Sequence, residues 1–225
     1  MDTVRINGNE YNILCRGEDG PVIVLGSSKE HENYAETVFS RVCEITEAPF
    51  VLCVFEVSDW DGDYSPWAWT DPGSGRSFSG KGPDTLKRLE NDLIPYLKEH
   101  FEAPLYIAGY SLAGLFALWA MYESNCFAGA ISCSGSLWFE GFIDYMKQRR
   151  APEGSSVYLS LGGKEEKCAD PVISTIGNCT RLADDILSND PSVRRNTLEM
   201  NKGGHFADSA KRLAKGIKFI IGRSC

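Results

Sequence analysis

Gly109-Tyr110-Ser111-Leu112-Ala113 joins two apolar segments of different kinds. Residues 105–108 before it are typical of a short buried strand, and residues 115–122 after it are typical of a helix that is apolar on almost every side. A serine at such a junction stands on a sharp turn, where small residues two positions away on either side let strand and helix approach closely. The stretch therefore predicts a nucleophilic serine, Ser111. A plain strand-to-helix turn with a capping serine is the alternative.

The rest of the chain alternates strand-like apolar runs with amphipathic helical runs. This alternation predicts an α/β fold with a mostly parallel central sheet and helices on both faces. The length of 225 residues suits one domain, residues 1–225, and the segment 136–155 is too short for a large cap domain. An N-terminal strand pair turning at residues 7–9 precedes strands expected at 22–25, 50–57, 105–108, 128–133, 157–161 and 194–200. Helices are expected at 33–45, from 84 onward, after 111, at 171–187 and at 206–221.

Composition excludes several classes of function. The net charge of −8 and the absence of a long Lys/Arg run argue against nucleic acid as a partner. No apolar run is long enough to span a bilayer, and the N-terminus does not resemble a signal peptide. The eight cysteines are spread evenly and no CxxC occurs, so we expect reduced thiols and no metal site. A cytoplasmic protein without a membrane partner is the expectation.

A serine nucleophile needs a base, and the chain has three histidines. His205 lies in a glycine-rich loop after the last expected strand, at the sheet edge that also carries the serine turn. Ligands of parallel sheets bind at this edge, so His205 is the predicted base. His100 is expected to end a helix away from the site, and we give His31 a similar structural role.

These residues resemble a known family. The stretch from Gly109 to Leu118, the aromatic stretch 59–67 and the stretch 158–166 are similar to the putative esterase family that includes enterochelin esterase-like and esterase D-like α/β-hydrolases. The resemblance covers most of the chain. It implies an α/β-hydrolase fold, serine-dependent cleavage of carboxylic esters, and no metal or organic cofactor.

The resemblance also implies where the third catalytic residue and the oxyanion hole lie. The chain order serine, acid, histidine of α/β-hydrolases places the acid in the loop 162–166, where we favour Glu165 because its distance from the strand end resembles that of the acid in other α/β-hydrolases. Glu166 is the neighbouring alternative, Asp170 and Asp184 are weaker ones, and a Ser-His dyad without an acid is a further possibility. The oxyanion hole would use the backbone N–H of Leu112 and a second N–H from the loop after strand 22–25. Ser27 is our choice for this second donor, and Ser28 is nearly equivalent.

Aromatic residues near the same edge are candidates for a substrate pocket. Trp60 and Trp67 follow strand 50–57, and Trp138 follows strand 128–133. The same rings could instead form a hydrophobic cluster that pins a long loop. We therefore expect a carboxylic ester hydrolase acting on a small or medium ester through an acyl-enzyme. An acyltransferase with the same residues, a serine peptidase and a catalytically inactive binding protein are the alternatives.

Overall fold

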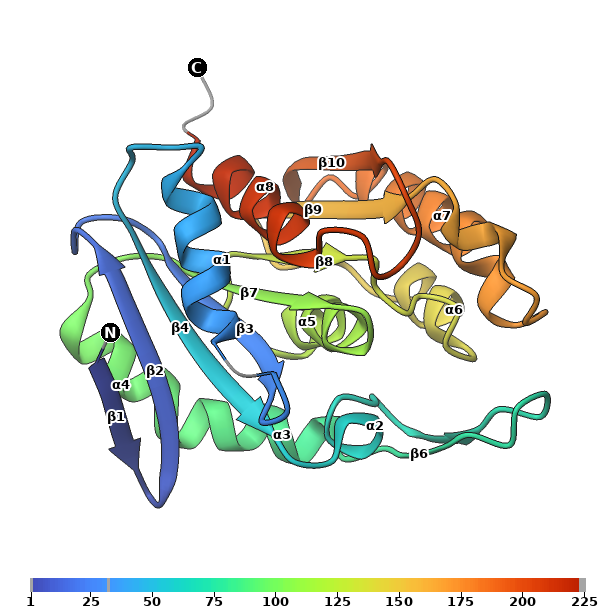
Figure 1. The fold of residues 1–225 in the computed structure, drawn as a ribbon, viewed down its shortest axis with the longest axis horizontal. Coiled ribbons are helices and arrows are strands. Elements are labelled where there is room, and N and C mark those ends of the chain that lie inside the picture. The colour runs from blue at the N-terminus through green and yellow to red at the C-terminus, as the bar shows by residue number, and fades with distance from the viewer. Residues whose placement is uncertain (1, 32, 223–225) are drawn as a thin grey trace.

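The computed structural model describes residues 2–31 and 33–222, and an eight-stranded sheet forms its centre (Figure 1). Six neighbouring strands of this sheet are parallel, and the first two strands of the chain are antiparallel additions at one edge. In spatial order the strands are β1 (Asp2–Ile6), β2 (Asn9–Arg16), β4 (Phe50–Val57), β3 (Val22–Ser28), β7 (Leu105–Tyr110), β8 (Gly129–Cys133), β9 (Ser155–Gly162) and β10 (Val193–Asn201). The predicted mostly parallel sheet is confirmed.

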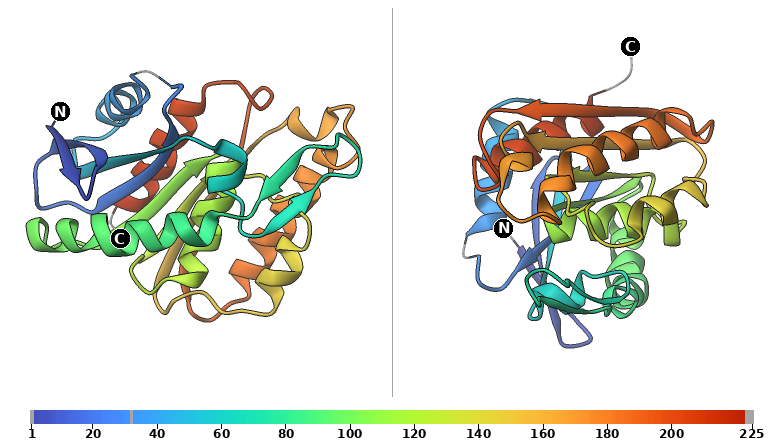
Figure 2. Two further views of the ribbon diagram at one scale, coloured as in Figure 1. Left: turned by 90° about the horizontal axis from the view of Figure 1, so that it is seen from below. Right: turned by 90° about the vertical axis from the view of Figure 1, so that its right-hand side faces the viewer.

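Helices cover both faces of the sheet, as Figure 2 shows in its left-hand view. One face carries α1 (Tyr34–Cys43) and α8 (Ser209–Ile221). The other face carries α3 (Gly82–Arg88), α4 (Ile94–His100), α5 (Leu112–Glu123), α6 (Phe142–Lys147) and α7 (Ile176–Ser188). A buried apolar cluster lies on each side of the sheet, which is why the parallel strands are apolar on both faces.

The helix that follows the serine turn is buried on all sides. Every residue of α5 from Leu112 to Met121 is buried, in keeping with a sequence that shows no polar face. The helix packs against β7 and β8 and lies beneath the centre of the sheet. This central burial holds the start of α5, and with it Ser111, in a fixed place.

Several element boundaries differ from those expected. Strand β3 continues to Ser28, so residues 26–28 belong to the strand and not to a loop. The helix expected from residue 84 begins at Gly82, and its irregular turn is a π-helical segment, Leu89–Leu93, just before Pro95. Pro95 has no N–H to donate to the carbonyl four residues earlier, so the helix changes its hydrogen-bond register there.

The aromatic segment after β4 has structure that periodicity does not predict. It holds a short helix, α2 (Trp60–Asp63), and a separate two-stranded sheet of β5 (Ala68–Thr70) and β6 (Ser77–Ser79). In Figure 1 this segment extends to the lower right, beyond the carboxyl ends of the parallel strands. We call residues 60–79 the aromatic arm.

The expected start of the last helix is wrong. Helix α8 begins at Ser209 and not at Phe206, because Asp208 before it adopts a left-handed backbone conformation with φ 51°. Phe206, the first residue of the expected helix, is 96% exposed. Residues 202–208 instead form a loop that leads from β10 to α8. No helix within residues 2–31 and 33–222 is both long and apolar enough to cross a bilayer.

Candidate active site

Ser111 occupies a strained turn between β7 and α5. Its backbone has φ 59° and ψ −124°, a combination that non-glycine residues rarely adopt. Gly109 makes the turn possible, because a Cβ at this position would lie 2.0 Å from the carbonyl oxygen of Ala113. The N–H of Ser111 donates to the carbonyl of Cys133 in β8 (3.0 Å), which anchors the turn to the neighbouring strand. The serine side chain is therefore presented at the carboxyl edge of the sheet, which faces the viewer in the right-hand view of Figure 2.

A chain of hydrogen bonds joins the serine to a histidine and a carboxylate. Nε2 of His205 lies 3.0 Å from Oγ of Ser111, and Nδ1 of His205 lies 2.8 Å from Oε2 of Glu165. The three residues come from the ends of β7, β10 and β9. The imidazole is 30% exposed, whereas the carboxylate is only 2% exposed. The arrangement can take a proton from the serine hydroxyl and hold the imidazole in one tautomer.

Glu165 is held as a carboxylate by donors on its second oxygen. Oε1 accepts hydrogen bonds from Ser134 Oγ, the N–H of Gly162 and Arg212 Nη1, each at 2.7 Å. Burial raises the pKa of Glu165, but the hydrogen bonds from His205, Ser134 and Gly162 outweigh it and lower the pKa below its ordinary value. The carboxylate thus stays charged opposite His205.

The neighbouring Glu166 has a different environment. Its carboxylate pairs with Arg181 of α7 at 3.0 Å, and the two side chains are 37% and 52% exposed, respectively. Of the two glutamates that the sequence offers, the structure brings Glu165 to His205 and turns Glu166 toward the surface.

Arg212 is a functional candidate that the sequence analysis missed. It lies in α8, and its side chain is 2% exposed. The sequence did contain a signal, because Arg212 falls on the same face of α8 as the buried Leu213 and Gly216. A charged residue in a buried stripe needs a partner, and here the partner is the carboxylate of Glu165.

Leu112 and Ser27, the residues of the two expected oxyanion donors, line the same cavity as Ser111. The N–H of Leu112 belongs to the first turn of α5, where a helix offers no internal acceptor. At the end of β3, Lys29 donates its N–H to the carbonyl of Val57 in β4 (3.4 Å). Because successive N–H groups of a strand alternate between its two neighbours, the N–H of Ser27 also faces β4. The N–H of Ser28 faces the other neighbour, β7.

A cavity of about 1040 Å³ opens beside Ser111. Trp60 and Trp138 line it, as do Phe78 from the aromatic arm and Phe206 from the histidine loop. This volume is at the upper end of the range for small-molecule sites. Aromatic rings therefore form part of the wall, and charged side chains such as Arg76, Lys164 and Lys167 line it as well.

Trp67 does not line the cavity, contrary to the expectation from sequence. Its ring packs against those of Phe139, Phe142 and Tyr145, and its Nε1–H donates to the carbonyl of Glu140 (3.1 Å). The alternative role applies here, because these contacts attach the aromatic arm to α6 and to the segment just before it.

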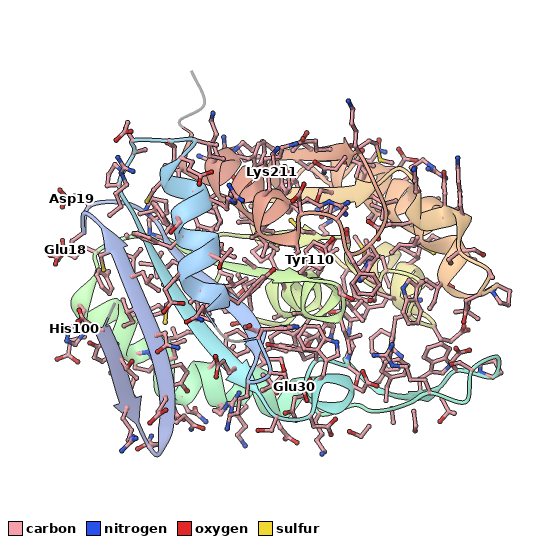
Figure 3. The ribbon with its side chains drawn as sticks, in the orientation of Figure 1. Glu18, Asp19, Glu30, His100, Tyr110 and Lys211 are labelled. Carbon is pink, nitrogen blue, oxygen red and sulfur yellow. The ribbon has the colours of Figure 1, made fainter. Side chains whose placement is uncertain are left out.

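The other two histidines lie in different places. His100 stacks on Tyr96 at the end of α4, on the far left of Figure 3, well away from Tyr110 at the end of β7. His31 lines the cavity and packs edge-on against Trp60 at 6.0 Å between ring centroids. Neither contacts Ser111. In the described part of the chain, no cluster of three or more His, Cys, Asp or Glu side chains could hold a metal ion.

Comparison with known proteins supports the fold. No family model matches the chain, and no curated protein matches it. An IroE-like serine hydrolase from Shewanella oneidensis is similar in structure, with a TM-score of 0.79, 15% identity, and coverage of 98% of this chain and 79% of that one. The siderophore hydrolase EstB from Aspergillus nidulans has a TM-score of 0.70 and 15% identity, covering 98% and 94%.

An S-formylglutathione hydrolase from Agrobacterium tumefaciens is similar over 99% of this chain and 100% of its own, with a TM-score of 0.59 and 12% identity. These structures have the α/β-hydrolase fold, and the resemblance inferred from the sequence is confirmed at the level of that fold. Each of the three is named as a hydrolase.

Proposed function

We propose that this protein is a serine carboxylic ester hydrolase that works through an acyl-enzyme. The observation that carries the proposal is the hydrogen-bonded chain from Ser111 through His205 to Glu165, with Ser111 in a strained turn beside a cavity. Ser111 is the nucleophile, His205 the general base and Glu165 the residue that orients His205. The hydrolase names of the similar structures support the same reaction class.

The reaction has two acyl-transfer steps. Oγ of Ser111 attacks the ester carbonyl carbon while Nε2 of His205 takes the hydroxyl proton, and the resulting imidazolium donates from Nδ1 to Glu165. The tetrahedral intermediate collapses to the acyl-enzyme, and His205 passes the proton to the departing alcohol. Water then attacks the acyl carbon with the same base, and the acid product leaves Ser111 free.

Backbone N–H groups stabilise the negative oxygen of the tetrahedral intermediate. We assign one donor to the backbone N–H of Leu112, as expected from the sequence. For the second donor we replace Ser27 with Ser28, because strand alternation directs the Ser27 N–H into the β3–β4 ladder and the Ser28 N–H toward β7. One such donor contributes on the order of 3 kcal/mol to the transition state.

The cavity favours a medium-sized ester. A volume of about 1040 Å³ exceeds the needs of a formyl or acetyl group alone, and rings of Trp60, Phe78 and Trp138 offer apolar walls. The protein is therefore proposed to bind a small-molecule ester whose acyl or alcohol part is apolar. The cytoplasmic location, the lack of a cofactor and the lack of nucleic-acid or membrane partners stay predictions of the sequence.

Rapid mixing with 4-nitrophenyl esters of increasing chain length tests the proposal. An acyl-enzyme mechanism releases nitrophenol in an initial burst equal to the enzyme concentration when deacylation is slow, and Ser111→Ala abolishes burst and turnover. Ser132→Ala is the matched control, because Ser132 is buried in β8 and its Oγ has no hydrogen-bond partner among the described residues. Turnover that persists in Ser111→Ala contradicts the proposal. Faster release of nitrophenol on addition of alcohols, with ester products, identifies an acyltransferase instead.

A further inference from the structure

Arg212 joins parts of the site that are far apart in the sequence. Its Nη1 donates to Glu165 Oε1 (2.7 Å), to Ser134 Oγ (2.7 Å) and to the hydroxyl of Tyr110 (3.0 Å). Its Nη2 donates to the carbonyl of Gly204 (2.8 Å), the residue before His205. One guanidinium therefore contacts the acid loop, the strand end before the nucleophile and the histidine loop.

A second contact reinforces the histidine loop. The hydroxyl of Tyr110 accepts from Arg212 and donates to the backbone carbonyl of His205 (2.5 Å). The loop that carries His205 is thus tied at the carbonyls of Gly204 and His205. Gly162 leaves room for this arrangement, because a Cβ there would lie 2.7 Å from both Glu165 Oε1 and Arg212 Nη2.

We propose that Arg212 is a positioning residue of the reaction, which holds Glu165 and the His205 loop in the reactive geometry and sets the pH at which the Glu165–His205 pair takes up a proton. This inference rests on the proposed function, since it assigns Arg212 a role in that same reaction. Arg212 does not touch the reacting atoms, so its effect passes through the two residues it holds.

The charge of Arg212 gives the proposal its pH dependence. A buried cation beside Glu165 opposes the binding of a further proton by the pair, whichever of the two residues receives it. Removing the cation therefore makes the pair bind its proton at higher pH, and the inactive protonated form persists to higher pH. The midpoint of the acid limb in the pH profile of kcat/KM must then shift to higher pH.

Other titratable groups near the pair do not compete for this role. Burial raises the pKa of each of three neighbours to about 12, and they stay neutral throughout the useful pH range; these are Tyr34, Tyr110 and Cys133. Lys164 and Lys167 stand at the two ends of the turn that carries Glu165, but both are exposed and their charges are screened by solvent. The buried cation that contacts Glu165 is Arg212.

A buried ion pair could also serve stability alone, and the experiment must separate the two roles. We would measure the pH profile of kcat/KM with a nitrophenyl ester for wild type, Arg212→Met and Arg212→Lys. Arg212→Met is expected to lower kcat about 100-fold through misplaced groups. The same change should raise the acid limb by about one pH unit through the lost charge. Arg212→Lys keeps the charge but not the planar fork, so it should lower kcat and leave the acid limb in place.

Arg181→Met is the matched control. It removes a cation that pairs with Glu166, the residue next to Glu165, without touching the buried network. Its kcat and acid limb should equal those of wild type. An acid limb in folded Arg212→Met that coincides with that of wild type overturns the proposal.

A second route covers the case in which Arg212→Met does not fold. Arg212→Gln removes the cation but keeps a side chain that can still donate to Glu165 Oε1, so it leaves a smaller packing defect than Arg212→Met. It should raise the acid limb in the same direction, and an unmoved limb in this variant contradicts the proposal. The state of wild type separates this inference from the proposed function. Wild type without ester turnover refutes the function, whereas active wild type with unshifted variants refutes only the role of Arg212.

Discussion

The two sides of the cavity are held in place by different kinds of interaction. On the side of β7 to β10, a buried ion pair and short hydrogen bonds hold His205 and Glu165. On the side of β4, ring contacts join the aromatic arm to the rest of the molecule, such as Trp69 packed on Phe139 at 5.1 Å and Trp67 packed on Phe139 at 5.7 Å. Hydrogen bonds are directional, whereas ring packing is spread over many weak contacts. Single substitutions should therefore change turnover on the first side, and affinity or stability on the second.

Removing the base tests the polar side most severely. His205→Ala should lower kcat by about 10⁶-fold, because Ser111 then has no acceptor for its proton. His100→Ala is the matched control, since His100 is exposed and stacks on Tyr96. Steady-state ester hydrolysis and thermal unfolding of both variants give the comparison. Near-normal turnover in His205→Ala would show that His205 is not the general base.

The two adjacent glutamates provide a sharper comparison on the same side. Glu165→Gln should lower kcat by about 10⁴-fold, because an amide can leave the imidazole in the wrong tautomer. Glu166→Gln should change kcat by less than about twofold, since this side chain pairs with Arg181 at the surface. Steady-state measurement of kcat for the two variants shows which glutamate orients His205. Equal losses in the two variants would contradict the assignment of Glu165.

On the aromatic side, two tryptophans should differ in which quantity they change. Trp60→Ala should raise KM about tenfold for an apolar ester and leave kcat nearly unchanged, because Trp60 lines the cavity. Trp67→Ala should lower the free energy of unfolding by about 2 kcal/mol with little change in KM, because its ring packs against Phe142 and Tyr145. Steady-state kinetics and chemical denaturation measure both. A raised KM in Trp67→Ala together with a lowered unfolding free energy in Trp60→Ala would show that Trp67 contacts the substrate and that Trp60 has the structural role.

The smallest expected effect is the pH dependence of stability at the buried carboxylate. The pKa of Glu165 is lower in the folded protein than its ordinary value of 4.5. Its contribution to stability is therefore complete above pH 4.5 and is lost as the pH falls through the lower folded-state pKa. Glu165→Gln should show a shallower decline of the unfolding free energy below pH 4.5 than wild type does. Denaturant titrations between pH 3 and pH 7 measure this difference, and parallel curves would contradict it.

The residues that the sequence could place are those at strand ends. Strand and helix patterns locate the turn at Ser111 and the loop of His205, because parallel strands bring their carboxyl ends to one edge. The loop of Glu165 follows from the chain order of the family that the sequence resembles. The sequence pattern of one strand and the turn after it is enough to place each of these loops at the edge of the sheet. The distances between these groups follow only from the assembled sheet.

Other features depend on contacts that no local pattern encodes. The burial of the Arg212 charge depends on its ion-pair partner Glu165, which lies 47 residues away in the chain. Trp67 lies outside the cavity because its ring packs against Phe142, which lies 75 residues later in the chain. Phe206 is exposed because the loop that carries His205 continues to residue 208 and α8 begins only at Ser209. The orientation of the Ser27 and Ser28 amides depends on which strand pairs with β3. Each of these features is set by tertiary contacts between segments that are distant in the sequence.

The most direct test of the central claim is covalent labelling of the folded protein with a fluorophosphonate, followed by mass spectrometry of its peptides. An activated serine reacts with this reagent without its natural substrate. One adduct is expected, on Ser111, and it should be lost in His205→Ala and kept in Glu166→Gln. A folded wild-type protein without an adduct on Ser111 would contradict the account and favour a hydrolase-fold binding protein.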